Sequence, residues 1–423
     1  MSAGVEARPA QAEQGLLTRL GPGILVAATG VGAGDLATAS FCGSQLGTAV
    51  LWAVLLGAFL KFVLNEGLAR WQLATGQTLL EGVVRRGGRA AGWVFLPYLG
   101  LWSFFVGSAL MGACGVTLHA MFPLFGDAAQ GKAAFGILAS LAGLALVRAG
   151  GFRLFERVMG LCIALMFGTV VVTAVVLWPG TGVVLRGLLV PSIPDAGGSG
   201  LGWTVALMGG VGGTLTVLCY GYWIREEGRS GPGHLARCRL DLGLGYAMTA
   251  LFGVSMVIIG STVQVEGSGA ALLVRLAERL EDQLGPVGRW AFLVGALGAV
   301  FSSVLGVWQA VPYLFADLWR LLLRRGGQEG ADPAVDTRSL PYRAYLLGLA
   351  TVPMLGLLMG FRQVQKLYAV LGATFIPVLA LVLLILNGRR TWVGVHANRW
   401  PTAVVLLGTL AFFAWLAWMG RAE

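Results

Sequence analysis

Charged residues are scarce in this chain. Asp, Glu, Lys and Arg make up 12% of its 423 residues, whereas hydrophobic residues make up 57% and the mean hydropathy is +0.77. A soluble domain could not cover so much apolar surface with so few charges. The composition therefore excludes a soluble protein and indicates one that crosses a membrane several times, with the lipid bilayer as its main partner.

Cysteine, histidine and catalytic motifs are also sparse or missing. The five cysteines and three histidines are dispersed, and no pair has the spacing of a metal site or a disulfide framework. The sequence contains no Gly-x-Ser-x-Gly, no His-Glu-x-x-His and no P-loop. We therefore expect no enzyme activity, no cofactor and no ATP-driven transport.

Apolar sequence long enough to cross a bilayer is abundant. A spanning helix needs about 20 apolar residues and must satisfy its backbone hydrogen bonds internally. We predict eleven transmembrane helices, over residues 20–45, 47–72, 92–121, 132–148, 154–178, 201–224, 240–264, 287–320, 342–360, 364–387 and 401–419.

Positive residues favour one side of this predicted bundle. With the N-terminus inside, the inner loops and ends hold 20 of the 30 Lys and Arg residues, and the outer loops hold 8. This bias indicates a bacterial-type cytoplasmic (inner) membrane protein, and an odd helix count places its C-terminus outside. The net charge of +10 follows from this topology and gives no indication of nucleic-acid binding.

The chain divides into two comparable halves. We predict a cytoplasmic tail over residues 1–18, a first repeat of five helices over 19–178, and a second repeat of five helices over 201–387. The second repeat contains an inner linker at 325–340, and an eleventh helix follows within 388–423. Nothing indicates an obligate protein partner, so we expect a monomer.

Two of the predicted helices carry glycine clusters. Glycine-interrupted helices at matching places in two repeats are typical of a transporter's midplane site, where unwound carbonyl groups bind cations. We therefore predict that helices 1 and 6 are discontinuous. The clusters comprise Gly30, Gly32 and Gly34 in the first helix and Gly209, Gly210, Gly212 and Gly213 in the sixth.

Asp35 follows the first glycine cluster directly. An ionisable residue inside a membrane is a functional candidate, so we expect its carboxylate to contact the substrate. Asp is also a favoured N-cap residue, and capping of the restarted helix is the alternative role; the two roles are compatible.

These features resemble the Nramp family of divalent-metal transporters. The resemblance is carried by residues 15–82, with a Gly-Pro-Gly lead-in at 21–23, the break at 32–35 and a Gly-Ser-Gln turn at 43–45, and it weakens toward residue 265. It implies an all-α LeuT-type fold, in which two inverted five-helix repeats are followed by one extra helix. It also implies metal transport by alternating access.

The sequence departs from the family pattern at the implied metal site. The family's Asp-Pro-Gly-Asn falls on residues 32–35, so Gly32 replaces the usual acid and Asp35 stands in place of the Asn. The family's methionine falls on Thr216, and a hydroxyl suits Mg²⁺ or Mn²⁺ better than Fe²⁺. Because the third helix has no acid from Leu99 to Gly112, we expect no proton coupling by the usual route.

The other metal ligands are predicted to be oxygen atoms at the two breaks and at the start of helix ten. This predicted set comprises Gly32, Gly34, Gly213, Thr214, Thr216 and Gln363. A second set, comprising Thr29, Cys219, Tyr220 and Trp223, is predicted to line the pathway. The alternatives are backbone hydrogen bonding for the threonines, apolar packing for Cys219 and a plain helix-end position for Gln363.

Two further polar groups lie at or inside predicted helices. We expect Lys61, Asn65 and Glu66 of helix two to pair with polar groups on other helices, with gating as the alternative. Arg225, Glu226 and Glu227 end helix six, where we expect solvated charges or, alternatively, a latch of the inner gate.

The sequence thus predicts a secondary transporter for a small inorganic divalent cation, with Mg²⁺ or Mn²⁺ favoured. The cation is expected to be the substrate of this transporter and not its cofactor. One carboxylate is little compensation for a dehydrated dication, so we expect the ion to keep part of its hydration shell. A transporter of a small organic cation or amino acid is the alternative within the same fold, because a fold does not decide its substrate. A relative that no longer transports and acts as a sensor is a third possibility.

Overall fold

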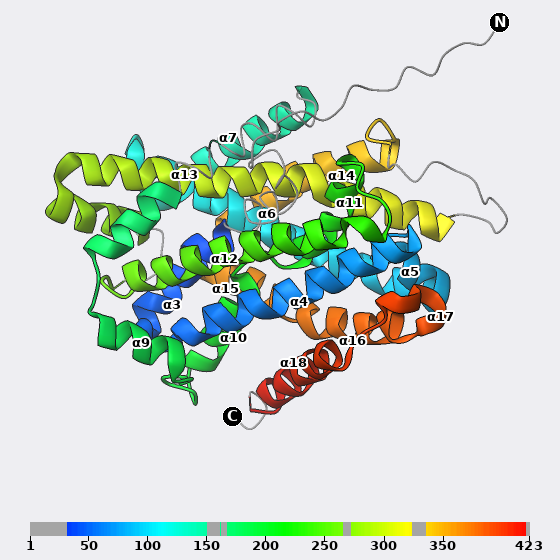
Figure 1. The fold of residues 1–423 in the computed structure, drawn as a ribbon. Helices are drawn as coiled ribbons and strands as arrows, with labels where there is room; N and C mark the ends of the chain where they lie inside the picture. Colours follow the sequence, from blue (N-terminus) through cyan, green and yellow to red (C-terminus); the bar gives the residue numbers. More distant parts are fainter. Residues whose placement is uncertain (1–31, 150–160, 162–166, 265–271, 324–335, 420–423) are drawn as a thin grey trace, which may run out of the picture.

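The regular elements in the described part of the chain are helices. The computed structural model describes residues 32–149, 161, 167–264, 272–323 and 336–419. Figure 1 shows the longest helices running across the molecule along a common axis. In chain order the elements are η1 (Ala33–Thr38), α3 (Ala39–Leu46), η2 (Gly47–Val50), α4 (Leu51–Thr75), α5 (Leu79–Gly87), α6 (Arg89–Met121), α7 (Ala128–Ala149), α9 (Thr181–Leu189), α10 (Gly200–Gly210), η3 (Leu215–Cys219), α11 (Tyr220–Glu226), η4 (Pro232–His234), α12 (Leu235–Gly260), α13 (Leu272–Leu323), α14 (Leu340–Thr351), η5 (Val352–Leu358), α15 (Phe361–Ala373), α16 (Phe375–Gly388), α17 (Arg390–Val393), η6 (Gly394–His396) and α18 (Trp400–Met419).

The predicted count of eleven spans is not confirmed. Within the described residues, eight helical segments are long and apolar enough to cross a membrane, or nine if the bent pair Phe167–Val176 and Thr181–Leu189 is one span. Predicted helices one and two are counted together as Asp35–Thr75. Of the predicted helix 154–178, residues 154–160 and 162–166 lie outside the described residues. The predicted helix 342–360 consists of α14 followed by η5, a 3₁₀ helix.

The chain reverses between α3 and α4, although η2 joins them without a gap. The turn η1 lies beside Gly253 of α12, and Ser40 of α3 lies against Gly260, farther along that helix. α4 then returns along α12, where the Asn65 amide donates to the Tyr246 hydroxyl at 3.0 Å. α3 therefore runs in the direction of α12 and α4 runs against it, as two separate crossings of the bundle would.

The predicted sixth helix is interrupted, as its glycines indicated. α10 ends at Gly210, and the chain continues through η3 into α11. Gly212 and Gly213 have φ angles of 75° and 77°, in the left-handed region that favours glycine. The interruption of helix six is thus confirmed, and its cause is a pair of backbone conformations that side-chain-bearing residues disfavour.

The first predicted helix is irregular where its description begins. Gly32 lies in a turn, and its carbonyl accepts from the Leu36 N–H at 2.8 Å; η1, which follows it, is a π-helix. π-helical turns inside longer helices often mark functional sites. Residues 20–31 of this helix lie outside the described residues.

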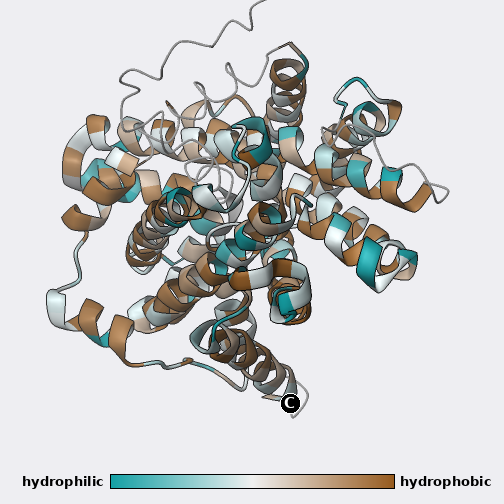
Figure 2. Ribbon diagram, turned by 45° about the vertical axis from the view of Figure 1, so that its right-hand side comes forward, coloured by the Kyte–Doolittle hydropathy of each residue, from teal (hydrophilic) through white to brown (hydrophobic). Residues whose placement is uncertain are grey.

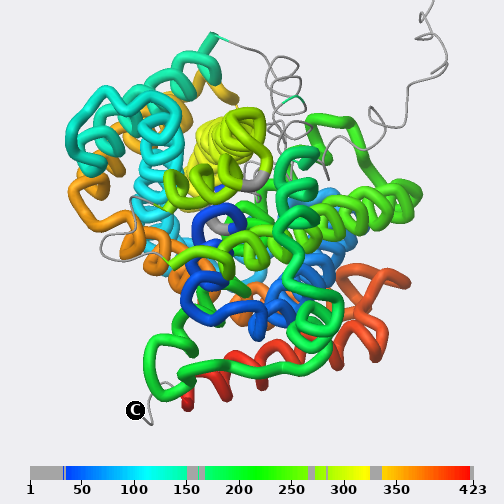
Figure 3. Tube along the Cα trace, turned by 90° about the vertical axis from the view of Figure 1, so that its left-hand side faces the viewer, coloured from blue at the N-terminus to red at the C-terminus, as the bar shows by residue number. Residues whose placement is uncertain are grey.

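The outer surface of the bundle is largely apolar. Figure 2 shows hydrophobic residues along most helices, including those at the outside. Phe59, Leu138 and Leu407 are 50%, 58% and 56% exposed, which fits contact with lipid and not with water. Figure 3 looks along the bundle and shows α18 at its edge, where it packs on α16 and α4.

Candidate functional site

Asp35 joins the two helix breaks. It lies in the first turn of η1, and its side chain is completely buried. Its Oδ2 accepts a hydrogen bond of 3.1 Å from the Gly212 N–H, so the carboxylate is tied to the second break. The other oxygen, Oδ1, is buried without a hydrogen-bond partner. Because a buried, unpartnered carboxylate oxygen is costly, this atom marks a place where a cation would be stabilised.

Lys61 is the second charged group at the breaks. Its side chain is 1% exposed, and its Nζ donates to the Gly209 carbonyl at 2.7 Å and to the Val211 carbonyl. The ammonium also attracts the Asp35 carboxylate electrostatically. The prediction that Lys61 pairs with polar groups of another helix is confirmed, and those groups are backbone carbonyls at the end of α10, where helix six is interrupted.

The carbonyls that Lys61 binds are free because α10 stops there. The last helical bond of α10 runs from the Val211 N–H to the Leu207 carbonyl, at 3.0 Å. The carbonyls beyond it have no partner within the helix, and the helix dipole adds partial negative charge at this end. The end of α10 is therefore suited to a cation.

Thr214 and Thr216 lie close together in the sequence but in different environments. The Thr214 Oγ1 accepts a hydrogen bond of 2.6 Å from the Trp102 indole, so this oxygen is already engaged. Thr216 lies in η3 and is 6% exposed, and within the described residues its hydroxyl has no hydrogen-bond partner. Thr216 is thus the threonine whose oxygen is available to a substrate, and Gly213, directly before Thr214, supplies the φ angle of the break.

Gly32 is needed for close packing as well as for the break. A Cβ at this position would collide with the Ser303 hydroxyl of α13, so α13 packs directly on the first break. Gly34 lies within η1, whereas Thr29 lies outside the described residues.

Gln363, a predicted ligand, is exposed, as the alternative of a plain helix-end position would have it. It lies on the exposed side of α15, whereas Gln365, two residues later, is completely buried. A separation of two residues turns a side chain by about 200° around a helix. The Gln365 amide donates to the Ala109 carbonyl at 2.8 Å, and its Oε1 is buried without a partner. Tyr368, one turn further along the same face, lies within electrostatic reach of Asp35.

The predicted pathway residues of α11 are buried among helices. The Tyr220 hydroxyl donates to Asp241 of α12 at 3.3 Å, and the Trp223 indole donates to Gln309 of α13 at 3.2 Å. Cys219 is buried as a free thiol at the end of η3. Tyr220 and Trp223 therefore fix α11 against its neighbours, which makes them supports of the broken helix.

Within the described residues, no group of three or more His, Cys, Asp or Glu side chains could hold a metal ion. Any cation at the breaks would be held by Asp35, by hydroxyl and amide oxygens and by backbone carbonyls. Such a donor set is all oxygen, which suits hard cations.

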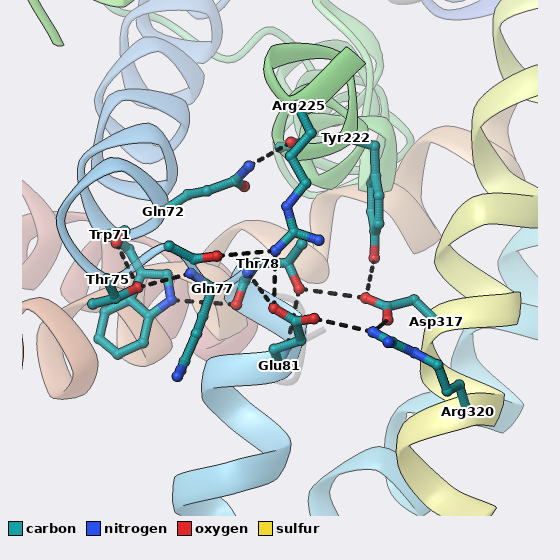
Figure 4. A network of polar contacts seen from close by, with 12 residues as sticks. Trp71, Gln72, Thr75, Gln77, Thr78, Glu81, Tyr222, Arg225, Asp317 and Arg320 are labelled. Atoms are coloured by element: carbon teal, nitrogen blue, oxygen red, sulfur yellow. Dashed lines mark hydrogen bonds and ion pairs between the residues drawn. The ribbon is translucent and has the colours of Figure 1, made fainter. Parts of the chain in front are cut away.

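A second polar cluster lies at the end of the bundle that carries α5 and α11 (Figure 4). Glu81 of α5 accepts from Arg225 of α11 at 3.0 Å and from Arg320 of α13 at 3.1 Å. Arg320 also pairs with Asp317 at 2.6 Å, and Asp317 accepts from the Tyr222 hydroxyl at 2.8 Å. We call these five residues the Glu81 cluster; they connect three helices that are far apart in the sequence.

The start of α5 places Glu81 for this task. Thr78 and Glu81 form a capping box, in which the Thr78 hydroxyl accepts from the Glu81 N–H at 3.1 Å and the Glu81 carboxylate accepts from the Thr78 N–H at 2.8 Å. Such a box satisfies the free N–H groups at a helix start and fixes the acidic side chain. Arg225 is thus held in an ion pair with its side chain 19% exposed, and its role as a latch stays a prediction.

Sequence reasoning missed Gln365 and Glu81 and undervalued Lys61. Gln365 was identifiable only by the register of α15, which the sequence leaves uncertain by a residue or two. Glu81 carried a signal, since Thr78 and Glu81 have the Thr-x-x-Glu spacing of a capping box. For Lys61, the sequence indicated burial but could not give the partner.

Comparison with known families and curated proteins gives consistent likenesses. The profile described as Nramp, natural resistance-associated macrophage protein-like, matches residues 23–421. The divalent metal cation transporter MntH of Chromohalobacter salexigens is 28% identical over 252 residues, which cover 57% of this chain and 56% of that protein. This match thus spans little more than half the length of that relative. An uncharacterized protein of Pasteurella multocida is 22% identical over 344 residues, 79% of this chain and 77% of that protein.

Solved structures share the fold at low sequence identity. The manganese transporter of Eremococcus coleocola, in complex with an aromatic bis-isothiourea compound, has a TM-score of 0.67 and 17% identity, and the match covers 96% of this chain and 87% of that one. MhsT in complex with L-phenylalanine has a TM-score of 0.60 and 14% identity, covering 92% and 97% of the two chains. The expected LeuT-type fold is thereby confirmed.

Proposed function

This chain belongs to the Nramp family, and we propose that it is a secondary transporter that moves divalent metal cations across a cytoplasmic membrane. The MntH relative supports this proposal, because its name assigns it divalent metal cations. The single observation that carries the proposal is Asp35, a fully buried carboxylate with one unpartnered oxygen, placed where two broken helices meet.

The donor set favours Mg²⁺ or Mn²⁺ as the substrate. Thr216 replaces the methionine of the family pattern, so no thioether is offered at that position. Asp35 supplies the fixed negative charge, while Thr216 and Gln365 add neutral oxygens. Mg²⁺ sheds its water reluctantly, so a site with one carboxylate suits an ion that keeps part of its hydration shell.

Transport is proposed to proceed without the proton route of the family. The stretch Leu99–Gly112 of α6 contains no acidic residue. The driving force would then be the membrane potential, which contributes about 2.3 kcal/mol per elementary charge per 100 mV.

Access to the site is proposed to alternate, with the Glu81 cluster as the latch of the cytoplasmic side. The excess of Lys and Arg supports an orientation with the N-terminus and the α5 end inside and the C-terminus outside. Opening toward the cytoplasm would then require α11 to leave α5 and α13, breaking the ion pairs of Arg225 and Arg320 with Glu81.

The function is tested by uptake into proteoliposomes. Purified protein is reconstituted with an interior metal-sensing dye, and Mn²⁺ and Mg²⁺ are added outside under an inside-negative potential set with K⁺ and valinomycin. We expect saturable uptake that grows with the potential, without acidification reported by an internal pH dye. Absence of uptake of both ions would refute the proposal, and acidification coupled to uptake would refute the uncoupled mechanism alone.

A second candidate substrate is an amino acid or other small zwitterion. The observation that favours it is the presence of both signs of charge at the breaks, Asp35 and Lys61, which could each bind one end of a zwitterion. The same proteoliposomes, given radiolabelled amino acids, separate the two candidates.

A further inference from the structure

Lys61 reaches the breaks because of the way α4 meets α10. Gly57 of α4 lies against Met208 of α10 so closely that a Cβ at Gly57 would be 3.1 Å from the Met208 carbonyl oxygen. Lys61 lies four residues further along, on the same face of α4. The close approach at Gly57 therefore brings the Lys61 side chain directly over the end of α10.

The ammonium of Lys61 takes a position made for a cation. It donates to the carbonyls of Gly209 and Val211, which are freed because α10 ends there. Freed carbonyls and the C-terminal ends of broken helices are the groups that coordinate cations in transporters of this architecture. Lys61 is thus bound as a substrate cation would be, except that a covalent stem holds it in place.

The positive charge of Lys61 offsets the negative charge of Asp35, and this affects how strongly the breaks attract a cation. With Lys61 present, the carboxylate of Asp35 and the ammonium cancel, so the two residues offer a dication no net negative charge. Without it, Asp35 would stand as an uncompensated negative charge in a fully buried place. A cation at the breaks must therefore compete with Lys61 both for carbonyl oxygens and for the field of Asp35.

We propose that Lys61 is a tethered competitor of the transported cation, which holds the carbonyls at the end of α10 until a dication displaces it. This inference rests on the proposed function, since it assumes that a metal uses these oxygens. A competitor of charge +1 is displaced more readily by a dication than by a monovalent cation, because the dication gains twice the attraction from Asp35. Lys61 thereby lowers the affinity for all cations and favours divalent ones.

The test compares Lys61→Met with Lys132→Met. Lys132 of α7 is the matched control, because it is also buried, at 4% exposure, and its Nζ donates to one backbone carbonyl, that of Met359, at 2.7 Å. In proteoliposomes, K61M is expected to lower the KM for Mn²⁺ uptake at least tenfold. It is also expected to make this uptake sensitive to inhibition by Na⁺ at roughly 150 mM, the ionic strength of the cell. K132M is expected to match the wild type in both respects.

A second measurement observes Lys61 directly and does not depend on the variant's folding. The chain contains three lysines, Lys61, Lys132 and Lys366. Protein labelled with ¹³C at the lysine Cε therefore gives three side-chain signals, which the single variants assign. Titration of the wild type with Mg²⁺ is expected to shift the Lys61 signal and to leave the Lys132 signal in place.

The outcomes separate the two proposals. An unmoved Lys61 signal at Mg²⁺ concentrations that saturate uptake, or an unchanged or raised KM in folded K61M, overturns the tethered competitor while metal transport stands. A wild-type protein that neither takes up Mn²⁺ nor responds to Mg²⁺ overturns the proposed function itself.

Discussion

Replacing Glu81 by Gln should release the latch at the α5 end without unfolding α5. Gln serves at this position of a capping box as well as Glu does, so the start of the helix is kept. The amide oxygen can replace Oε2, which accepts from Thr78 and Arg225, but the amide NH₂ that replaces Oε1 cannot accept from Arg320. The substitution therefore weakens one ion pair and removes the other.

The size of the effect follows from these two contacts. A hydrogen bond to a charged group contributes about 1.5–3 kcal/mol, so the lost Arg320 contact costs about 2 kcal/mol. The Arg225 contact keeps its charged donor but loses the carboxylate charge, which weakens it by about 1 kcal/mol, so the two changes together cost about 3 kcal/mol. The side chains of Arg225 and Arg320 are 19% and 27% exposed, so water recovers part of this cost and leaves about 2 kcal/mol. That is about a 30-fold shift in the equilibrium, which raises an open population of about 1% to about 20%.

Double electron–electron resonance measures this population. Nitroxide labels are placed at Arg85 of α5 and at Ser230, which follows α11, both exposed, in a background without the native cysteines. Glu81→Gln should add a longer distance component, and Glu227→Gln should not, because Glu227, the residue that follows α11, has no ion pair within the described residues. A distance distribution for E81Q that coincides with that of the wild type would refute the latch.

Three further predictions concern the breaks themselves. Asp35→Asn keeps the shape of the side chain and the acceptor for the Gly212 N–H but removes the charge. Mn²⁺ uptake should therefore fall at least about tenfold, with little change in melting temperature. Uptake at the wild-type rate would exclude Asp35 as the metal's counter-charge. Gly212→Ala places a side chain on a backbone with φ 75°, with its Cβ 3.1 Å from Thr249. This change should lower the free energy of unfolding by about 1–2 kcal/mol, measured by thermal melts in detergent. The control Gly348→Ala lies in a helix and its Cβ meets no neighbouring atom within 4 Å, so it should be neutral or stabilising. Gln365→Leu should lower Mn²⁺ uptake while Gln363→Leu should not, and equal effects of the two would contradict the register of α15.

Much of the fold could be predicted from the sequence, because membrane helices are recognisable by their apolar composition and their length. The interruption of helix six followed from Gly212 and Gly213, whose φ angles of 75° and 77° are open to glycine at little cost. The number of spans could not be fixed in the same way. Short or irregular helices such as η5 have the composition of a span without its regular geometry.

The site was less accessible to sequence reasoning, because its contacts join residues far apart in the chain. The bond from the Gly212 N–H to Asp35 spans 177 positions, and the bond from Lys61 to Val211 spans 150. A sequence can show that Lys61 is buried and therefore needs a partner, but only helix packing decides which one. Gln363 illustrates the same limit on a smaller scale, since a shift of two residues moves an amide from the core to the surface.

The pairing of Asp35 with Lys61 has a consequence for how voltage acts on the cycle. When the empty carrier returns to its outward-facing state, the Asp35 carboxylate and the Lys61 ammonium together carry no net charge. The membrane potential therefore does not act on this pair during the return step. If the protein carries a dication inward as proposed, that half of the cycle takes up the whole electrical work, about 4.6 kcal/mol per 100 mV for two charges. Such a protein would rectify, filling the cell steadily under an inside-negative voltage and losing the ion again only slowly.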